Sequence, residues 1–157
     1  MEKVKMITID SSTSKSGVAF WINGELQEYK LLDFHKEKTT SIKFDKMARA
    51  LLDTLDYYKP NIIWLEEAVV TRNAQTQRVL LRLQGVVYTW CILNNCEFNT
   101  IRPAEWRKLC DAEFSGKREE LKAIAVQFVK DRYDIETTDD VAEAICIGNS
   151  ILNMFDK

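Results

Sequence analysis

The sequence predicts a single α/β domain over residues 1–157, with a five-stranded mixed sheet and helices on both of its faces. Two observations lead to this class. Three β-rich segments near the N-terminus are separated only by short polar turns, as in an antiparallel meander. Two later apolar segments each follow a helical pattern, so these strands join through helical crossovers. No internal repeat, low-complexity stretch or linker divides the sequence.

Residue types and turn signals predict the three antiparallel strands. Residues 3–10 alternate and are rich in Val, Ile and Thr, and a polar turn follows them. Residues 18–22 make a second strand that ends at Asn23-Gly24, a strong hairpin signal. Residues 26–34 return as the third strand.

The first crossover is a helix whose apolar residues recur at helical spacing from Phe44 to Tyr58. Lys59-Pro60 ends this helix. Residues 61–65 then form a short apolar run, which is typical of a strand buried on both faces.

The second crossover is a long helix over about 74–93, with Asn73 as its N-cap. Residues 98–101 make the last strand. Pro103 starts a short helix, at a position where proline is tolerated. A further helix covers about 117–132.

Thr137 or Thr138 caps the final helix, and Asp140 and Glu143 lie off its apolar stripe. That stripe consists of Val141, Ala144, Ile145, Gly148, Leu152 and Phe155.

Four acids are candidate functional residues because the predicted elements can bring them together. Asp10 closes the first strand and Glu66 follows the fourth, and ligands of open α/β sheets bind outside the carboxyl ends of strands. Asp140 and Glu143 are three residues apart, so they share one face of the final helix. Taken singly, each acid is equally well explained as a strand-end or first-turn charge.

Two neighbouring acids leave alternatives open. Asp139 precedes Glu143 by four residues and could share its face in place of Asp140. Glu67 should point away from Glu66 if the strand continues. We prefer Asp140 over Asp139, and Glu66 over Glu67, as the functional acids.

Converging carboxylates repel one another, and hard divalent cations relieve that repulsion. Two Mg²⁺ ions about 3.5–4 Å apart can activate a water and stabilise the leaving oxygen in phosphodiester hydrolysis. We therefore expect two Mg²⁺ per active site, with Mn²⁺ as a substitute.

The charge pattern fits an anionic substrate in one region of the chain. The net charge is −2, which alone does not indicate nucleic-acid binding. Between Thr71 and Lys108, however, basic residues clearly outnumber acids. A basic surface beside an acidic cluster suits a metal-using phosphodiesterase, although scattered solvated charge would look the same.

Other residue classes are less informative. The spacing of Cys91, Cys96, Cys110 and Cys146 fits neither a zinc ribbon nor a redox pair, so we interpret them as structural. The single His35 excludes most histidine-based catalysis. No apolar run is long enough for a membrane span, and no signal peptide is apparent, so we expect a cytoplasmic location.

Four groups of segments stand out by their order and spacing, and they run nearly from end to end of the chain. They are Ile9-Asp10 with Gly17-Val18, Trp64 to Glu67 with Thr71 to Ala74 and Gln84 to Val86, Arg102 to Lys108 with Gly116-Lys117, and Asp140 to Ile145. Taken together, these segments resemble the RuvC family of Holliday-junction resolvases, and the short chain is similar to the phage-encoded branch of that family.

The resemblance implies an RNase H-like fold, a homodimer and metal-dependent cleavage of four-way DNA junctions in a bacterial or phage-infected cell. Asp10, Glu66, Asp140 and Glu143 match the family's metal-binding acids. Lys117 matches a basic catalytic position near the scissile phosphate.

The same resemblance places DNA contacts on basic segments. Arg72 and Asn73 match the loop that approaches DNA after the second acid. Arg78 and Arg82 lie one turn apart and could follow a phosphate track or simply be solvated. The basic helix that begins at Lys117 adds two further candidate contacts, Arg118 and Lys122.

The sequence departs from the family pattern in three places. Ser11-Ser12 follow Asp10 where Pro-Gly is usual, and Glu143 stands where aspartate is common. The loop after the second acid has Ala68, Val69 and Val70 where many members carry an aromatic wedge. We therefore expect broader cleavage of branched DNA, including forks and flaps.

The helix over 74–93 has more apolar residues than one buried face requires, which favours a dimer contact, although burial on two sides within the monomer would also explain it.

Two other functions remain: an RNase H-like nuclease acting on RNA, and a branched-DNA-binding protein that does not cleave. Retention of all four acids argues against the binder, because bare acids repel phosphate. A sugar-kinase-like ATPase is excluded by the lack of glycine-rich phosphate loops.

Overall fold

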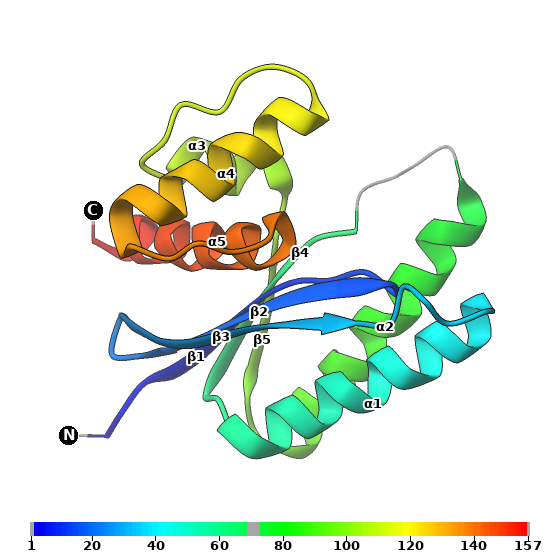
Figure 1. Ribbon diagram of the computed structural model, residues 1–157. Coiled ribbons are helices and arrows are strands. Elements are labelled where there is room, and N and C mark those ends of the chain that lie inside the picture. Colours follow the sequence, from blue (N-terminus) through cyan, green and yellow to red (C-terminus); the bar gives the residue numbers. More distant parts are fainter. Residues whose placement is uncertain (1, 69–72, 157) are drawn as a thin grey trace.

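The computed structural model describes residues 2–68 and 73–156. One five-stranded sheet forms its centre, in the order β3-β2-β1-β4-β5 (Figure 1). β1, β2 and β3 pair antiparallel, whereas β4 and β5 each run parallel to their inner neighbour. The strands are β1 (Lys5–Asp10), β2 (Lys15–Ile22), β3 (Glu25–Asp33), β4 (Ile62–Glu66) and β5 (Glu97–Ile101). The predicted fold class is confirmed.

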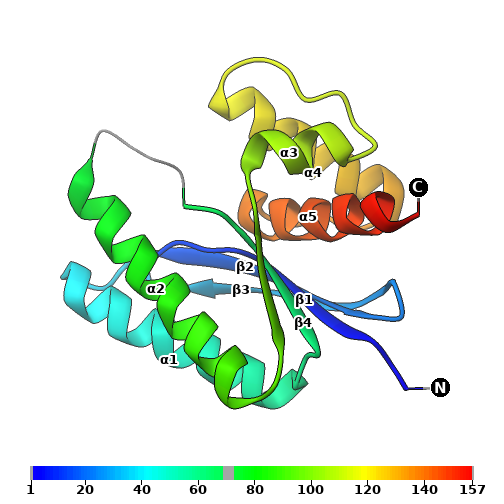
Figure 2. The ribbon, with the colours of Figure 1, turned by 180° about the vertical axis from the view of Figure 1, so that it is seen from behind.

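Five helices cover the two faces of the sheet (Figures 1 and 2). One face carries the two crossover helices, and the opposite face carries the three C-terminal helices. The helices are α1 (Thr40–Tyr58), α2 (Ala74–Leu93), α3 (Pro103–Leu109), α4 (Arg118–Tyr133) and α5 (Asp139–Phe155). Among the described residues, no helix is long and apolar enough to cross a membrane.

Helix ends follow their capping residues. The Asn73 side chain accepts a hydrogen bond from the Thr76 backbone N–H, so α2 begins where predicted. Thr138 occupies the N-cap of α5 with extended backbone, but its side chain makes no capping hydrogen bond. Lys59 ends α1 in the left-handed conformation, directly before Pro60.

β2 starts at Lys15, earlier than the predicted start at Val18. Lys15, Ser16 and Gly17 pair with β3, and Gly17 also pairs with Asp10 of β1. Backbone pairing with β3, and at Gly17 with β1 as well, outweighs the weak strand preference of these residues. The polar turn after β1 is therefore shorter than the sequence indicates.

α5 is buried on all sides rather than along one stripe. Every residue from Val141 to Ile151 is buried. The sheet lies against one side of this helix, and α3 and α4 pack against the other (Figure 1). The predicted stripe is only part of this burial, and its last member, Phe155, is 70% exposed. Glu143 is enclosed with the apolar residues around it.

Candidate metal centre

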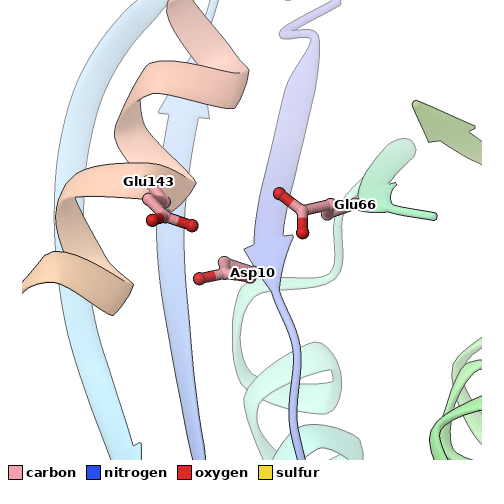
Figure 3. Close-up of side chains that lie close together, drawn as sticks. All are labelled: Asp10, Glu66 and Glu143. Carbon is pink, nitrogen blue, oxygen red and sulfur yellow. The ribbon is translucent and has the colours of Figure 1, made fainter. Parts of the chain in front are cut away.

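Three acids from separate elements converge at the carboxyl end of the central strands. Asp10 ends β1, Glu66 ends β4, and Glu143 lies in the second turn of α5. One carboxylate oxygen from each residue lies within 4.8 Å of those of the other two. Figure 3 shows the three side chains directed toward a common point. The sheet brings Asp10 and Glu66 together because β1 and β4 are parallel neighbours.

Gly17 allows α5 to approach the end of β1. Gly17 pairs with Asp10 across the sheet. A Cβ atom at Gly17 would lie 2.0 Å from the Asp140 carbonyl oxygen, a distance that no side chain could occupy. The beginning of α5 is therefore pressed against β2 next to Asp10, and only glycine permits this approach.

A buried polar contact fixes the next turn of α5. The Thr8 hydroxyl donates a hydrogen bond to the Ala144 carbonyl at 2.7 Å and accepts one from the Trp21 indole N–H at 3.0 Å. A Cβ at Gly148 would lie 2.1 Å from the Trp21 ring, so this helix turn lies directly on the indole. These contacts set the position of Glu143, the residue before Ala144.

Glu66 is held through both its side chain and its backbone. The Trp106 indole N–H donates to Glu66 Oε2 at 2.8 Å. The Gln84 side-chain amide, from α2 on the opposite face of the sheet, donates to the Glu66 carbonyl at 3.0 Å. Gln84 lies in one of the segments that carried the family resemblance.

The three acids are placed where ionisation is unfavourable. Burial, followed by the charges of Glu66, Glu143 and Asp140, raises the pKa of Asp10 well above its usual value. Burial, and then the charge of Glu66, raises the pKa of Glu143 to about 7. Burial also raises the pKa of Glu66, opposed by the Trp106 hydrogen bond and by Arg107 and Arg118.

Asp140 lies near this cluster but is not one of its three members. Its charge contributes to the raised pKa of Asp10, and burial raises its own pKa. Asp139 instead forms an ion pair with Lys122, with Nζ and Oδ2 3.2 Å apart. The charge of Asp139 in turn contributes to the raised pKa of Glu143, so both acids lie near the cluster.

The predicted basic residues are distributed unevenly around the cluster. Lys117 is the exposed N-cap of α4, and in the described part of the chain it forms no ion pair with any of the three acids. Arg118 is exposed but close enough to Glu66 to lower the pKa of its carboxyl. Arg78 and Arg82 are exposed on α2, and Arg72 falls outside the described residues. The side chain of Asn73 caps α2.

Two residues with direct links to the site were not predicted. Trp106 in the short helix α3 is fully buried, and a sequence pattern gives no reason to distinguish it from a core aromatic. Its neighbour Arg107 lowers the pKa values of both Glu66 and Glu143. The buried Arg107 Nε has no hydrogen-bond partner among the described residues. The only signal was the position of both residues just after a strand neighbouring β4.

The donor set fits a hard divalent cation. It consists of three carboxylates, and the charge of Glu66 raises the pKa values of both Asp10 and Glu143. Within residues 2–68 and 73–156, no lysine, arginine or histidine forms an ion pair with any of the three. Carboxylate oxygens of this kind are the ligands that Mg²⁺ and Mn²⁺ prefer.

Known proteins similar to this chain carry the name RuvC. No protein-family model matches the chain. The chain is 20% identical over 150 residues to the crossover junction endodeoxyribonuclease RuvC of Caldicellulosiruptor saccharolyticus, covering 92% of this chain and 90% of the relative. It is 26% identical over 150 residues to the RuvC of Brachyspira hyodysenteriae, covering 91% of each.

Among solved structures, RuvC is similar to this chain as well. The structure of T. thermophilus RuvC in complex with Holliday junction substrate matches with a TM-score of 0.74 and 11% identity, covering 98% of this chain and 95% of that protein. The resemblance inferred from the sequence is therefore confirmed. In sequence over nine-tenths of its length, and in its RNase H-like fold, this chain is similar to the RuvC proteins.

Proposed function

We propose that the chain is an endodeoxyribonuclease that cleaves Holliday junctions by metal-dependent phosphodiester hydrolysis. The observation that carries this proposal is the convergence of Asp10, Glu66 and Glu143 within 4.8 Å. The relatives named crossover junction endodeoxyribonuclease, and the related structure with a Holliday junction substrate, support DNA junctions as the substrate class. Cleavage adds a water oxygen to phosphorus and breaks one P–O ester bond.

The acids would hold Mg²⁺ or Mn²⁺, two ions per site in the full proposal. Asp10, Glu66 and Glu143 form the core of this site, and Asp140 would complete it from the first turn of α5. Bound divalent cations supply an activated water and stabilise the leaving oxygen. Burial of the carboxylates keeps bulk water away and strengthens their interaction with the ions.

Cationic side chains next to the acids would hold the DNA phosphates. Arg107 is partly buried and close to Glu66 and Glu143, and its Nε has no hydrogen-bond partner among the residues that the structure describes. Arg107 and Lys108 line one hollow, and Arg118, the first residue of α4, lies near Glu66. We propose that these three residues contact the DNA backbone next to the acids. Contacts farther from the acids would come from Lys117, Lys122, Arg78 and Arg82.

The breadth of the substrate range follows from the loop after β4. Ala68 is its last described residue, and Val69 and Val70 lie outside the described residues. These small and medium apolar side chains cannot stack on bases as an aromatic wedge would. We propose that forks and flaps are cleaved in addition to four-way junctions.

A homodimer through α2 is part of the proposal. Leu81, Tyr88 and Ile92 are half or more exposed and recur at spacings of seven and four, so they share one face of the helix. An isologous contact between two copies would cover this face and place two active sites on one junction. Action in the cytoplasm of a bacterial or phage-infected cell stays a prediction.

The deciding experiment is a cleavage panel with labelled four-way junction, Y-fork, flap, linear duplex and RNA–DNA hybrid, each with Mg²⁺, Mn²⁺ or EDTA. Glu66→Gln removes one charge from the cluster, and Glu67→Gln removes the neighbouring exposed charge as its matched control. Metal-dependent nicking of branched DNA by the wild type and Glu67→Gln, but not by Glu66→Gln, is expected.

Three other results would each overturn part of the proposal. Cleavage of the RNA strand alone would make the chain an RNA-directed nuclease. Tight junction binding without any cleavage would make it a structure-selective binder. Cleavage of four-way junctions with forks and flaps left intact would refute the broad substrate range.

A further inference from the structure

The fully buried Trp106 joins the metal site through a single polar contact. Its indole N–H donates to Glu66 Oε2 at 2.8 Å. An indole nitrogen can only donate, and a donor to a carboxylate makes a stronger hydrogen bond than a donor to a neutral oxygen. Because the indole is neutral, it orients the carboxylate without supplying the positive charge that would compete with a cation.

The fold leaves Trp106 little freedom to move. α3 follows β5 directly, and β5 pairs with β4 so that Ile101 lies beside Glu66. The Ser150 hydroxyl of α5 donates to the Trp106 carbonyl at 2.7 Å. The Phe114 ring packs edge-on against the indole at 5.4 Å. The indole N–H is therefore presented to Glu66 from a fixed position.

The orientation of the Glu66 side chain depends on this contact. Its side chain begins at the last residue of β4, and Gln84 restrains only its backbone. A glutamate has three side-chain torsions, so one bound oxygen removes most of the remaining freedom. The Trp106 contact thereby selects one orientation of the Glu66 carboxylate relative to Asp10 and Glu143.

We propose that Trp106 is a positioning residue that preorganises Glu66 for divalent-metal binding. The inference rests on the proposed function, because it assumes that Glu66 is a metal ligand. Partners that orient a metal ligand from outside the site typically change metal affinity by about 10- to 100-fold when they are removed. Loss of the indole N–H should therefore weaken metal binding by about tenfold or more.

The test measures Mn²⁺ affinity directly, by the loss of the free-ion electron paramagnetic resonance signal on titration of the full chain. Two changes remove the donor: Trp106→Phe, and replacement of the Trp106 indole by its benzothiophene isostere, benzothienylalanine, which keeps the bicyclic shape. Trp90→Phe is the matched control, because the buried Trp90 indole also donates to a carboxylate, Asp56 Oδ1, at 2.8 Å but belongs to the opposite core.

Both changes at Trp106 should weaken Mn²⁺ binding by at least about tenfold, and Trp90→Phe should leave it within about twofold of the wild type. Wild-type affinity in the isostere variant would overturn the inference, even if Trp106→Phe binds weakly, because packing alone would then explain the loss. Glu66→Gln separates the two proposals. If Glu66→Gln also binds Mn²⁺ like the wild type, the metal site itself is wrong; if it loses binding while the isostere retains it, only the role of Trp106 is wrong.

Discussion

The Cα of Gly17 faces the Asp140 carbonyl oxygen so closely that a Cβ would lie 2.0 Å from it. The same Cβ would lie 2.7 Å from the backbone nitrogen of Val141. Both obstacles are backbone atoms in the first turn of α5, so no side-chain rotation can relieve them. The spacing between β2 and α5, and with it the gap between Asp10 and Glu143, depends on a missing methyl group.

Gly17→Ala should therefore displace the first turn of α5 and damage both stability and metal binding. Overpacking of this kind typically costs about 1–3 kcal/mol, and here the cost should reach the upper end because backbone must move. Chemical denaturation in dilute protein measures the stability, and Mn²⁺ titration measures the site.

Gly85→Ala is the control for this substitution, because a Cβ there meets no atom within 4 Å and the residue lies inside α2. It should raise the free energy of unfolding by about 0.5–1 kcal/mol through its effect on helix propensity. If Gly17→Ala and Gly85→Ala have equal free energies of unfolding, the close approach of α5 at Gly17 does not affect stability.

Asp10→Asn should stabilise the metal-free protein while abolishing cleavage. Burial and three neighbouring acids make the charged form of Asp10 unfavourable, so a neutral amide of similar size relieves repulsion. A gain of about 1–2 kcal/mol in unfolding free energy at neutral pH is expected, the usual range when a strained functional group is relieved. Thermal unfolding in EDTA, beside a junction-cleavage assay, measures both effects. A less stable Asp10→Asn would contradict the electrostatic interpretation of the cluster.

The stability of the metal-free protein should depend on pH through Glu143. Its pKa is 4.5 in the unfolded chain and about 7 in the folded one, so between these values the folded state binds more protons. The unfolding free energy should therefore fall as the pH rises through this window, by a few kcal/mol. Asp10, whose pKa is also raised, adds in the same direction. Denaturation in EDTA across this range measures the slope.

Metal should reverse this loss, because cations bind the deprotonated carboxylates. Adding Mn²⁺ should raise the melting temperature strongly above pH 7 and very little below pH 4.5. Glu143→Gln should flatten the pH dependence. If the unfolding free energy of the metal-free wild type rises with pH between 4.5 and 7, the raised pKa of Glu143 is refuted.

The sequence was sufficient for the fold because each element carried its own local signal. The bounds predicted for α2 agree with the structure, since Asn73 caps one end and the apolar pattern stops at Leu93. The start of β2 was missed because Lys15 and Ser16 are held by pairing with β3, a contact that local propensity does not encode.

Within the site, residues at strand ends were predictable and residues that support them were not. Asp10 and Glu66 could be paired because parallel neighbouring strands end at the same edge of a sheet. The link from Trp106 to Glu66 joins residues 40 positions apart and depends on how α3 packs after β5. At the start of α4, the catalytic role was predicted for Lys117 and only a DNA contact for Arg118, yet Arg118 is the residue that lowers the pKa of Glu66.

Thr8→Val should weaken the attachment of α5 to the sheet. The substitution keeps the shape of the side chain but removes the hydroxyl that donates to the Ala144 carbonyl and accepts from Trp21. The Trp21 N–H would then be buried without a partner, which typically costs about 1–3 kcal/mol. Thr8→Ser keeps the hydroxyl and is the matched control. Denaturation should give Thr8→Ser a clearly larger free energy of unfolding than Thr8→Val. Equal losses of stability in the two variants would mean that the methyl group, not the hydroxyl, matters.

Ile92→Glu should disrupt the proposed dimer without unfolding the protein. Ile92 is 69% exposed in the single chain, so a carboxylate there is solvated in the monomer but would be buried against its own copy in a two-fold contact. Sedimentation velocity should show a concentration-dependent dimer for the wild type and a monomer for Ile92→Glu, with unchanged far-ultraviolet circular dichroism.

Ile42→Glu supplies the control, because Ile42 is a 40% exposed isoleucine on α1, outside the proposed contact. This variant should associate like the wild type. A dimer that survives Ile92→Glu but is lost in Ile42→Glu would move the interface from α2 to α1. Because cleavage of a four-way junction requires two symmetric nicks, monomeric Ile92→Glu should also release singly nicked junctions, whereas the α1 variant should resolve them completely.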